Sequence, residues 1–213
     1  MQNNGKNKKR NTYVAIILDS SGSMKRIKKE VVKLFNDQVV ELQNAAAKGV
    51  DGNVKISLIP FATNVPRPIF WNVDVDHLKP ISEDAYRPEG STALLDATGL
   101  VIDHLRKVAD INLPETQILV IIISDGLENA SRKYSHFEIA TRIEECESTG
   151  RWTFVYLGAD LYDAEKLGIH NTLQFDADRE GMTNASTTLS TATRAFMEGR
   201  KKGVGKNSKH FFN

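Results

Sequence analysis

Five residues in three separate segments of the chain could bind a metal ion. The first segment is the string Asp-Ser-Ser-Gly-Ser-Met at positions 19–24, where a carboxylate and two hydroxyls alternate. Carboxylate and hydroxyl oxygens are hard donors, which suit Mg²⁺ or Mn²⁺ better than they suit a soft metal. Taken alone, this string is explained equally well as a polar turn that caps a helix. The candidate ligands are Asp19, Ser21, Ser23, Thr92 and Asp125.

Elements of regular structure should bring the three segments together. Residues 12–18 and 117–123 are continuously apolar, which is typical of strands covered on both faces of a sheet. The first run ends directly before Asp19 and the second shortly before Asp125, whereas Thr92 precedes a helical pattern over 94–105. Ligands of open α/β sheets bind outside the carboxyl ends of the strands. We therefore expect the five residues to meet at that edge.

The remaining pattern alternates strands with helices. Pro66 and Pro68 restrict the third strand to an edge of the sheet, hairpinned antiparallel on the second strand. Ser135 and Glu138 have the spacing of a capping box, which predicts the start of a helix. The further expected strands are 54–61, 65–71, 152–157 and 172–175, and the further helices are 27–46, 137–146, 164–167 and 182–200.

This alternation predicts an α/β fold of the Rossmann-like, doubly wound kind. Its sheet should have six mainly parallel strands with one antiparallel edge strand, and helices should cover both faces. The length of 213 residues and a hydrophobic content of 40% suit one domain with a sizeable core. We place that domain at residues 12–200, between a basic arm at 1–11 and a basic tail at 201–213.

The two ends of the chain are basic and carry no acidic residue. Residues 1–10 contain four Lys or Arg and residues 199–213 contain five, which leaves 19 basic against 27 acidic residues between them. Gly- and Asn-rich basic ends are typical of solvated tails. We do not expect nucleic-acid binding, although an association through the tails is the alternative. Binding that persists at 200 mM salt and needs Mg²⁺ would exclude that alternative.

Cysteine content and hydropathy indicate the compartment. Cys146 is the only cysteine, so no intrachain disulfide can form, and a reducing environment is the simpler inference. The first ten residues lack the apolar core of a signal peptide, and no run approaches the length of a membrane span. We expect a cytoplasmic protein without membrane association.

The ordered set of D-x-S-x-S, a distant Thr and a distant Asp resembles the metal-ion-dependent adhesion site (MIDAS) of the von Willebrand factor A (VWA) domain family. The resemblance covers roughly residues 12–200, and the strings GSTALLDATG and SDGLENAS are similar to those of small stand-alone prokaryotic and phage members. It implies the VWA fold. It also implies that Ser21, Ser23 and Thr92 bind the metal directly, while Asp19 and Asp125 act through water or bind the metal themselves.

The resemblance further implies a metal-dependent protein-binding module rather than an enzyme. Mg²⁺ held mainly by hydroxyls keeps a position that a partner's Asp or Glu can fill. Some relatives work alongside ring-shaped ATPases, so such a complex is one setting for the unknown partner. Asp96 lies one helical turn after Thr92, and we expect it to hold the loop that contains Thr92 (the second loop) rather than the metal.

A phosphotransferase or hydrolase that uses Asp19 is the alternative enzyme. Aspartate-nucleophile phosphotransferases resemble D-x-D at such a strand end, but Ser21 stands at the second position and removes the general acid. The sequence contains no G-x-S-x-G and no Walker A motif. Four of the five histidines are expected at the surface or at helix caps; they are His77, His104, His136 and His170.

Four basic residues follow the first segment directly: Lys25, Arg26, Lys28 and Lys29. They lie in the first turns of the expected helix, where the helix dipole disfavours cations. A solvated helix face is the simpler interpretation, but a reason other than helix stability stays open.

Overall fold

One six-stranded sheet forms the centre of the protein in the computed structural model, which describes residues 10–48, 52–65, 67–108, 112–201 and 210–212. The strand order is β3-β2-β1-β4-β5-β6, and only the pairing of β3 with β2 is antiparallel within these residues. The strands are β1 (Thr12–Asp19), β2 (Val54–Phe61), β3 (Phe70–Asp74), β4 (Gln117–Ser124), β5 (Trp152–Gly158) and β6 (Asn171–Gln174).

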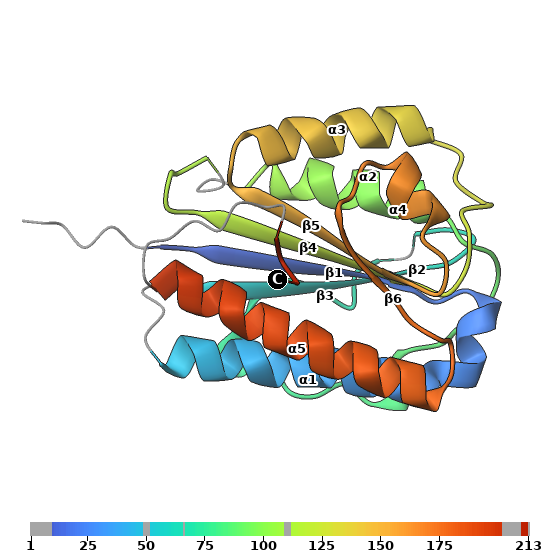
Figure 1. Cartoon of the computed structure of the whole chain (residues 1–213), viewed down its shortest axis with the longest axis horizontal. Coiled ribbons are helices and arrows are strands. Elements are labelled where there is room, and N and C mark those ends of the chain that lie inside the picture. Colours follow the sequence, from blue (N-terminus) through green and yellow to red (C-terminus); the bar gives the residue numbers. More distant parts are fainter. Residues whose placement is uncertain (1–9, 49–51, 66, 109–111, 202–209, 213) are drawn as a thin grey trace, which may run out of the picture.

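Helices cover both faces of this sheet. Figure 1 shows α1 and α5 on one side and α2, α3 and α4 on the other, which confirms the predicted Rossmann-like architecture. In the described segments, no helix combines the length and the apolar character that crossing a membrane requires. The helices are η1 (Gly22–Ile27), α1 (Lys28–Ala47), η2 (Val75–His77), η3 (Glu83–Ala85), α2 (Leu94–Leu105), α3 (His136–Ser148), α4 (Tyr162–Lys166) and α5 (Arg179–Lys201).

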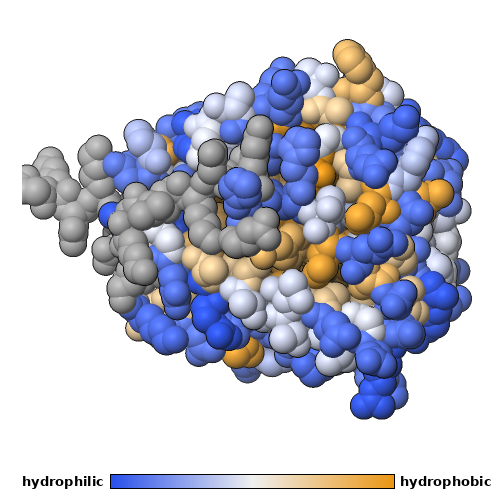
Figure 2. Space-filling model, in the orientation of Figure 1, coloured by the Kyte–Doolittle hydropathy of each residue, from blue (hydrophilic) through white to orange (hydrophobic). Residues whose placement is uncertain are grey.

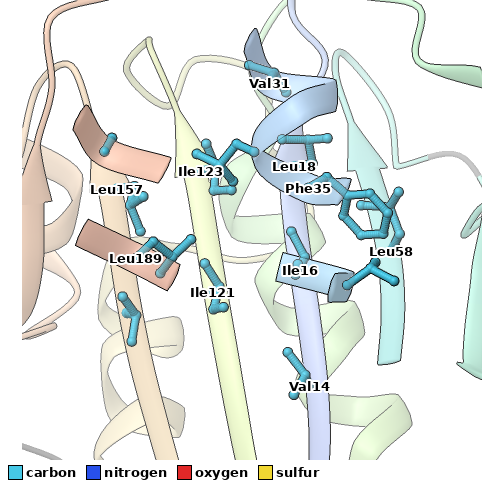
Figure 3. Packing of buried hydrophobic residues seen from close by; sticks show 14 of the residues in the cluster. Val14, Ile16, Leu18, Val31, Phe35, Leu58, Ile121, Ile123, Leu157 and Leu189 are labelled. Atoms are coloured by element: carbon cyan, nitrogen blue, oxygen red, sulfur yellow. The ribbon is translucent and has the colours of Figure 1, made fainter. Parts of the chain in front are cut away.

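The apolar run of β1 is continuous because the strand is buried on both faces. Side chains of a strand point alternately to the two sides of the sheet. Leu18 therefore packs with Phe35 of α1 and Leu189 of α5 in one cluster (Figure 3), whereas Ala15 and Ile17 pack in a second cluster beneath α2 and α3. Two hydrophobic layers therefore pack against β1, which ends at Asp19.

The predicted place of the third strand was wrong, although its type was right. We expected the strand at 65–71, and β3 instead begins at Phe70; Pro66 lies outside the described residues. Proline has no N–H to donate to a sheet, so pairing starts after Pro68, where the Ile69 N–H donates to the Leu58 carbonyl at 2.9 Å. The pairing contains an irregularity between Ile56 and Leu58.

Residues near both ends of the chain pack against the domain. The Arg10 guanidinium donates to the Arg200 carbonyl at 2.9 Å. Phe211 is buried, its ring centroid lies 6.1 Å from that of Phe196, and its N–H donates to Asn171 Oδ1 at 2.9 Å. In Figure 2, hydrophobic surface gathers in the middle of this side of the molecule, between the two helix layers. Positions 1–9, 202–209 and 213 of the predicted arm and tail lie outside the described residues.

Candidate metal centre

The loop after β1 and the loop before α2 meet at the carboxyl edge of the sheet, where β1 continues into η1 in Figure 1. The Gly22 N–H donates to the Gly90 carbonyl at 2.9 Å, and the Glu89 N–H donates to the Ser20 carbonyl at 2.6 Å. Gly90 has a φ of +84°, a backbone conformation that residues other than glycine rarely adopt. Two backbone hydrogen bonds therefore bring the segment before Thr92 against the segment that follows Asp19.

Asp19 is the last residue of β1 and its carboxylate is buried. Its Oδ1 accepts from the Ser21 N–H at 2.7 Å and its Oδ2 accepts from the Ser124 hydroxyl at 2.5 Å, while the Tyr86 hydroxyl donates to its carbonyl. Burial raises the pKa of Asp19 to about 6, although the bonds from Ser124 and Ser21 partly oppose this rise. A cation beside this carboxylate would stabilise its ionised form.

Ser23 lies in the first loop, which follows β1, and Asp125 lies in the third loop, which follows β4. A hydrogen bond between their side chains joins these two loops. The Ser23 hydroxyl donates to Asp125 Oδ1 at 2.5 Å. The hydroxyl oxygens of Ser21 and Ser23 lie 3.1 Å apart, within hydrogen-bond distance. The second oxygen of Asp125, Oδ2, lies 3.4 Å from Nη2 of Arg26. The first and third loops thus form one continuous polar network.

Thr92 lies at the same place and is buried. Its N–H donates to Asn129 Oδ1 at 2.9 Å, and its carbonyl accepts from the Asn129 N–H at 3.0 Å, so the third loop holds its backbone on both sides. A Cβ atom added to Gly126 would lie 3.7 Å from the Thr92 hydroxyl oxygen and 3.8 Å from the Ser23 hydroxyl oxygen. Both hydroxyls therefore border the small space beside Gly126.

This set of donors fits a hard divalent cation. Mg²⁺ takes oxygen ligands and usually keeps several waters, so a site with two carboxylates and three hydroxyls can hold it. Within the described residues, no group of three His, Cys, Asp or Glu side chains could hold a metal, so a site of that kind is not present there. The residues that would hold the ion are Asp19, Ser21, Ser23, Thr92 and Asp125.

Asp96 stabilises a different segment from the one expected. Its carboxylate accepts from the N–H groups of Arg132, Lys133 and Tyr134 at 2.9–3.2 Å. Asp96 therefore fixes the chain that leads into α3 instead of holding the second loop. Met24, which follows the first segment, is fully buried in the hydrophobic core.

Glu128 organises the third loop, and sequence reasoning did not identify it. Its carboxylate accepts from the N–H groups of Leu95, Ala130 and Ser131, at 3.0, 2.8 and 2.7 Å. The Glu128 N–H donates to the buried Asp163 carboxylate of α4 at 2.7 Å. The closeness of Glu128 to Asp125 in the string SDGLENAS could have indicated a role near the site. Its partner in α2, Leu95, is however 33 residues away in the sequence.

Comparison of the sequence with protein-family models and with curated proteins found no match. Solved structures are similar to it, each at low identity. They include a von Willebrand factor type A structure from Catenulispora acidiphila, at 13% identity and a TM-score of 0.56, and the D319A mutant of the PilB minor pilin from Streptococcus sanguinis, at 10% and 0.57. The match to these covers 87% and 90% of this chain, but 43% and 64% of the other chains.

A third similar structure is the manganese-loaded TRAP protein of Plasmodium vivax. Its identity is 16% and its TM-score 0.53, over 84% of this chain and 71% of that chain. At these identities the similarity establishes the fold. The chain has the VWA fold, as the resemblance of its sequence implied.

Proposed function

We propose that this chain is a metal-dependent protein-binding module. Mg²⁺ or Mn²⁺ is held by Asp19, Ser21, Ser23, Thr92 and Asp125, and it accepts a carboxylate from an Asp or Glu of a partner protein. When bound, the ion supplies a positive charge with an exchangeable coordination position. The residues of this chain place the oxygens around it.

The convergence of three loops carries this proposal. Ser23 of the first loop contacts Asp125 of the third at 2.5 Å, and both Ser23 and Thr92 face the space beside Gly126. A polar turn that only caps a helix would not need a matching carboxylate 102 residues further along the chain. The manganese in the similar TRAP structure supports the same interpretation, since that ion also prefers hard oxygen donors.

The environment of Asp19 favours ligand binding over nucleophilic catalysis. Its side chain is buried, and both carboxylate oxygens already accept hydrogen bonds. A nucleophile needs an exposed oxygen and a neighbouring acid or base. His136 instead bonds to Asp163 at 2.8 Å, and His104 packs edge-on against Trp71. We therefore propose a binding role and no catalytic residue.

Metal binding is the direct test. Mn²⁺ affinity would be measured by calorimetry for the unaltered protein, Asp19→Ala, Asp19→Asn and the exposed control Asp76→Ala. We expect both Asp19 variants to lose at least about tenfold in affinity, because removing a charged ligand weakens the site, while the control binds normally. Circular dichroism establishes that each variant folds. Equal affinity for all four proteins would refute the metal site.

The partner protein can be identified by the metal dependence of its binding. Affinity purification from the native cell, with and without EDTA, would separate metal-dependent partners from others. We expect one protein to be retained only without EDTA and to be lost with Asp19→Asn. A partner linked to a ring-shaped ATPase is one candidate. Retention that ignores both EDTA and Asp19→Asn would contradict a metal-mediated contact.

A further inference from the structure

Arg26 contacts the candidate metal centre from the side of η1. Its Nη2 lies 3.4 Å from Asp125 Oδ2. The Asp125 side chain has no exposed surface, whereas the Arg26 side chain is 60% exposed. The buried acid thus has a largely solvent-exposed arginine as its counter-charge.

Arg26 is the member of a basic group that contacts an acid. The group is Lys25, Arg26, Lys28 and Lys29, which lies where η1 passes into α1. Lys28 and Lys29 begin α1, where the helix dipole disfavours cations, whereas Lys25 and Arg26 lie in the last turn of η1. In the part of the chain that the structure describes, Arg26 is the member of this group that forms an ion pair. Its partner is Asp125, a candidate ligand of the metal.

A metal ion at the proposed site would compete with this contact. Asp125 Oδ1 accepts from Ser23, and Oδ2 faces Arg26, so the guanidinium supplies the positive charge next to this carboxylate. A divalent cation at the same carboxylate would repel the guanidinium, because both are positively charged. An exposed arginine holds its acid weakly, so its release requires little energy.

We propose that Arg26 is a charge-switching residue of the metal site. Without metal it neutralises Asp125; with metal bound it turns outward to a second carboxylate of the partner. This inference rests on the proposed function. The partner segment is acidic, with one carboxylate for the metal and another for Arg26.

The first test measures Mn²⁺ affinity of Arg26→Gln against Lys29→Gln. Both substitutions remove one positive charge from the same surface, but only Arg26 contacts Asp125. We expect Arg26→Gln to bind Mn²⁺ about fivefold more tightly, which is an ordinary size for the coupling between two sites. For Lys29→Gln we expect a change in Mn²⁺ affinity below about twofold, because solvent and salt screen the charge of an exposed lysine. Equal affinities for the two variants, or weaker binding by Arg26→Gln, would overturn the competition.

The second test uses peptides at saturating Mn²⁺. Two alanine-based peptides carry either one Glu or two Glu residues four positions apart. We expect the unaltered protein to bind the second peptide more tightly, and Arg26→Gln to bind both alike, with Lys29→Gln retaining most of the preference. If the unaltered protein has no preference, or if Arg26→Gln retains it, the partner-binding half of the proposal is wrong.

These results separate the switch from the function on which it rests. Mn²⁺ binding that depends on Asp19 but is the same in Arg26→Gln and Lys29→Gln refutes the switch and leaves the metal site intact. Absence of Mn²⁺ binding in every protein refutes the metal site, and the switch with it.

Discussion

The Ser23 hydroxyl donates a 2.5 Å hydrogen bond to Oδ1 of Asp125, although 102 residues separate the two in the chain. Strand order explains this contact. β1 and β4 are adjacent and parallel, with Leu18 paired to Ile123, so the residues that follow each strand emerge at the same level of the sheet. The proposed metal site thus lies at two neighbouring strand ends, beside the loop before α2.

Gly126→Ala should weaken metal binding without unfolding the protein. The added Cβ would lie 3.7 and 3.8 Å from the Thr92 and Ser23 hydroxyl oxygens, which is ordinary contact and leaves the loop unstrained. The methyl group would nevertheless occupy the space that both hydroxyls border. We expect at least about tenfold weaker Mn²⁺ binding, since a displaced ligand set loses affinity on that scale, with an unchanged melting temperature.

Gly90→Ala is the contrasting control for this prediction. Gly90 has a φ of +84°, and a Cβ there would lie 2.4 Å from the Thr63 hydroxyl oxygen. This variant should lose about 1–3 kcal/mol of stability because its backbone would be strained. If Gly126→Ala is destabilised to the same extent, or if it binds Mn²⁺ normally, the space beside Gly126 is not the metal position.

Thr92→Ala should weaken metal and partner binding while leaving the fold intact. The backbone of Thr92 is held by Asn129 through two hydrogen bonds that the substitution does not touch, so only the hydroxyl and the γ-methyl group are lost. Calorimetry with Mn²⁺ and thermal unfolding would be compared for Thr92→Ala and Thr92→Ser. The serine variant restores the oxygen and should bind Mn²⁺. Unfolding of the alanine variant would instead assign Thr92 a structural role.

The stability of the metal-free protein should depend on pH through Asp19. Burial raises the folded-state pKa of Asp19 to about 6 from 3.8, so the folded protein retains a proton that the unfolded chain has lost. The contribution of this group is fully present below pH 3.8 and is lost as pH rises through about 6. Its size is on the order of 2–3 kcal/mol.

Asp19→Asn isolates this effect, because its amide does not titrate. Urea unfolding of both proteins between pH 4 and 7 would be compared in EDTA. The stability difference between the asparagine variant and the unaltered protein should shift in favour of the variant as pH rises. A difference that is constant over this range would show that Asp19 keeps an ordinary pKa in the folded state.

Glu128→Gln should loosen the third loop. The Glu128 carboxylate accepts from the N–H groups of Leu95, Ala130 and Ser131, and a glutamine replaces one acceptor oxygen by a donor. We expect a loss of about 1–3 kcal/mol in urea unfolding, the cost of unsatisfied donors, with weaker Mn²⁺ binding. The exposed Glu144→Gln is the matched control, and an equal loss in both variants would contradict this role.

The sequence predicted most of the fold because local patterns encode it. Continuous apolar runs identified β1 and β4, and the spacing of Ser135 and Glu138 located the start of α3, where the structure has the expected capping box. The third strand was misplaced because the apolar residues at 65–71 suggested a strand, whereas pairing with β2 begins only after Pro68. Glu128 was overlooked because its link to α2 runs through the Leu95 N–H, which is distant in sequence.

The sequence by itself determined the fold class and predicted the five candidate metal ligands, since both inferences follow from residue types and short spacings. Tertiary structure alone decided the contact of Ser23 with Asp125, the burial of Asp19, the different role of Asp96 and the position of Arg26 against Asp125. The physical reason is distance along the chain. These contacts join segments separated by dozens of residues, and they exist only once the strand order places β1 beside β4 and packing fixes their ends.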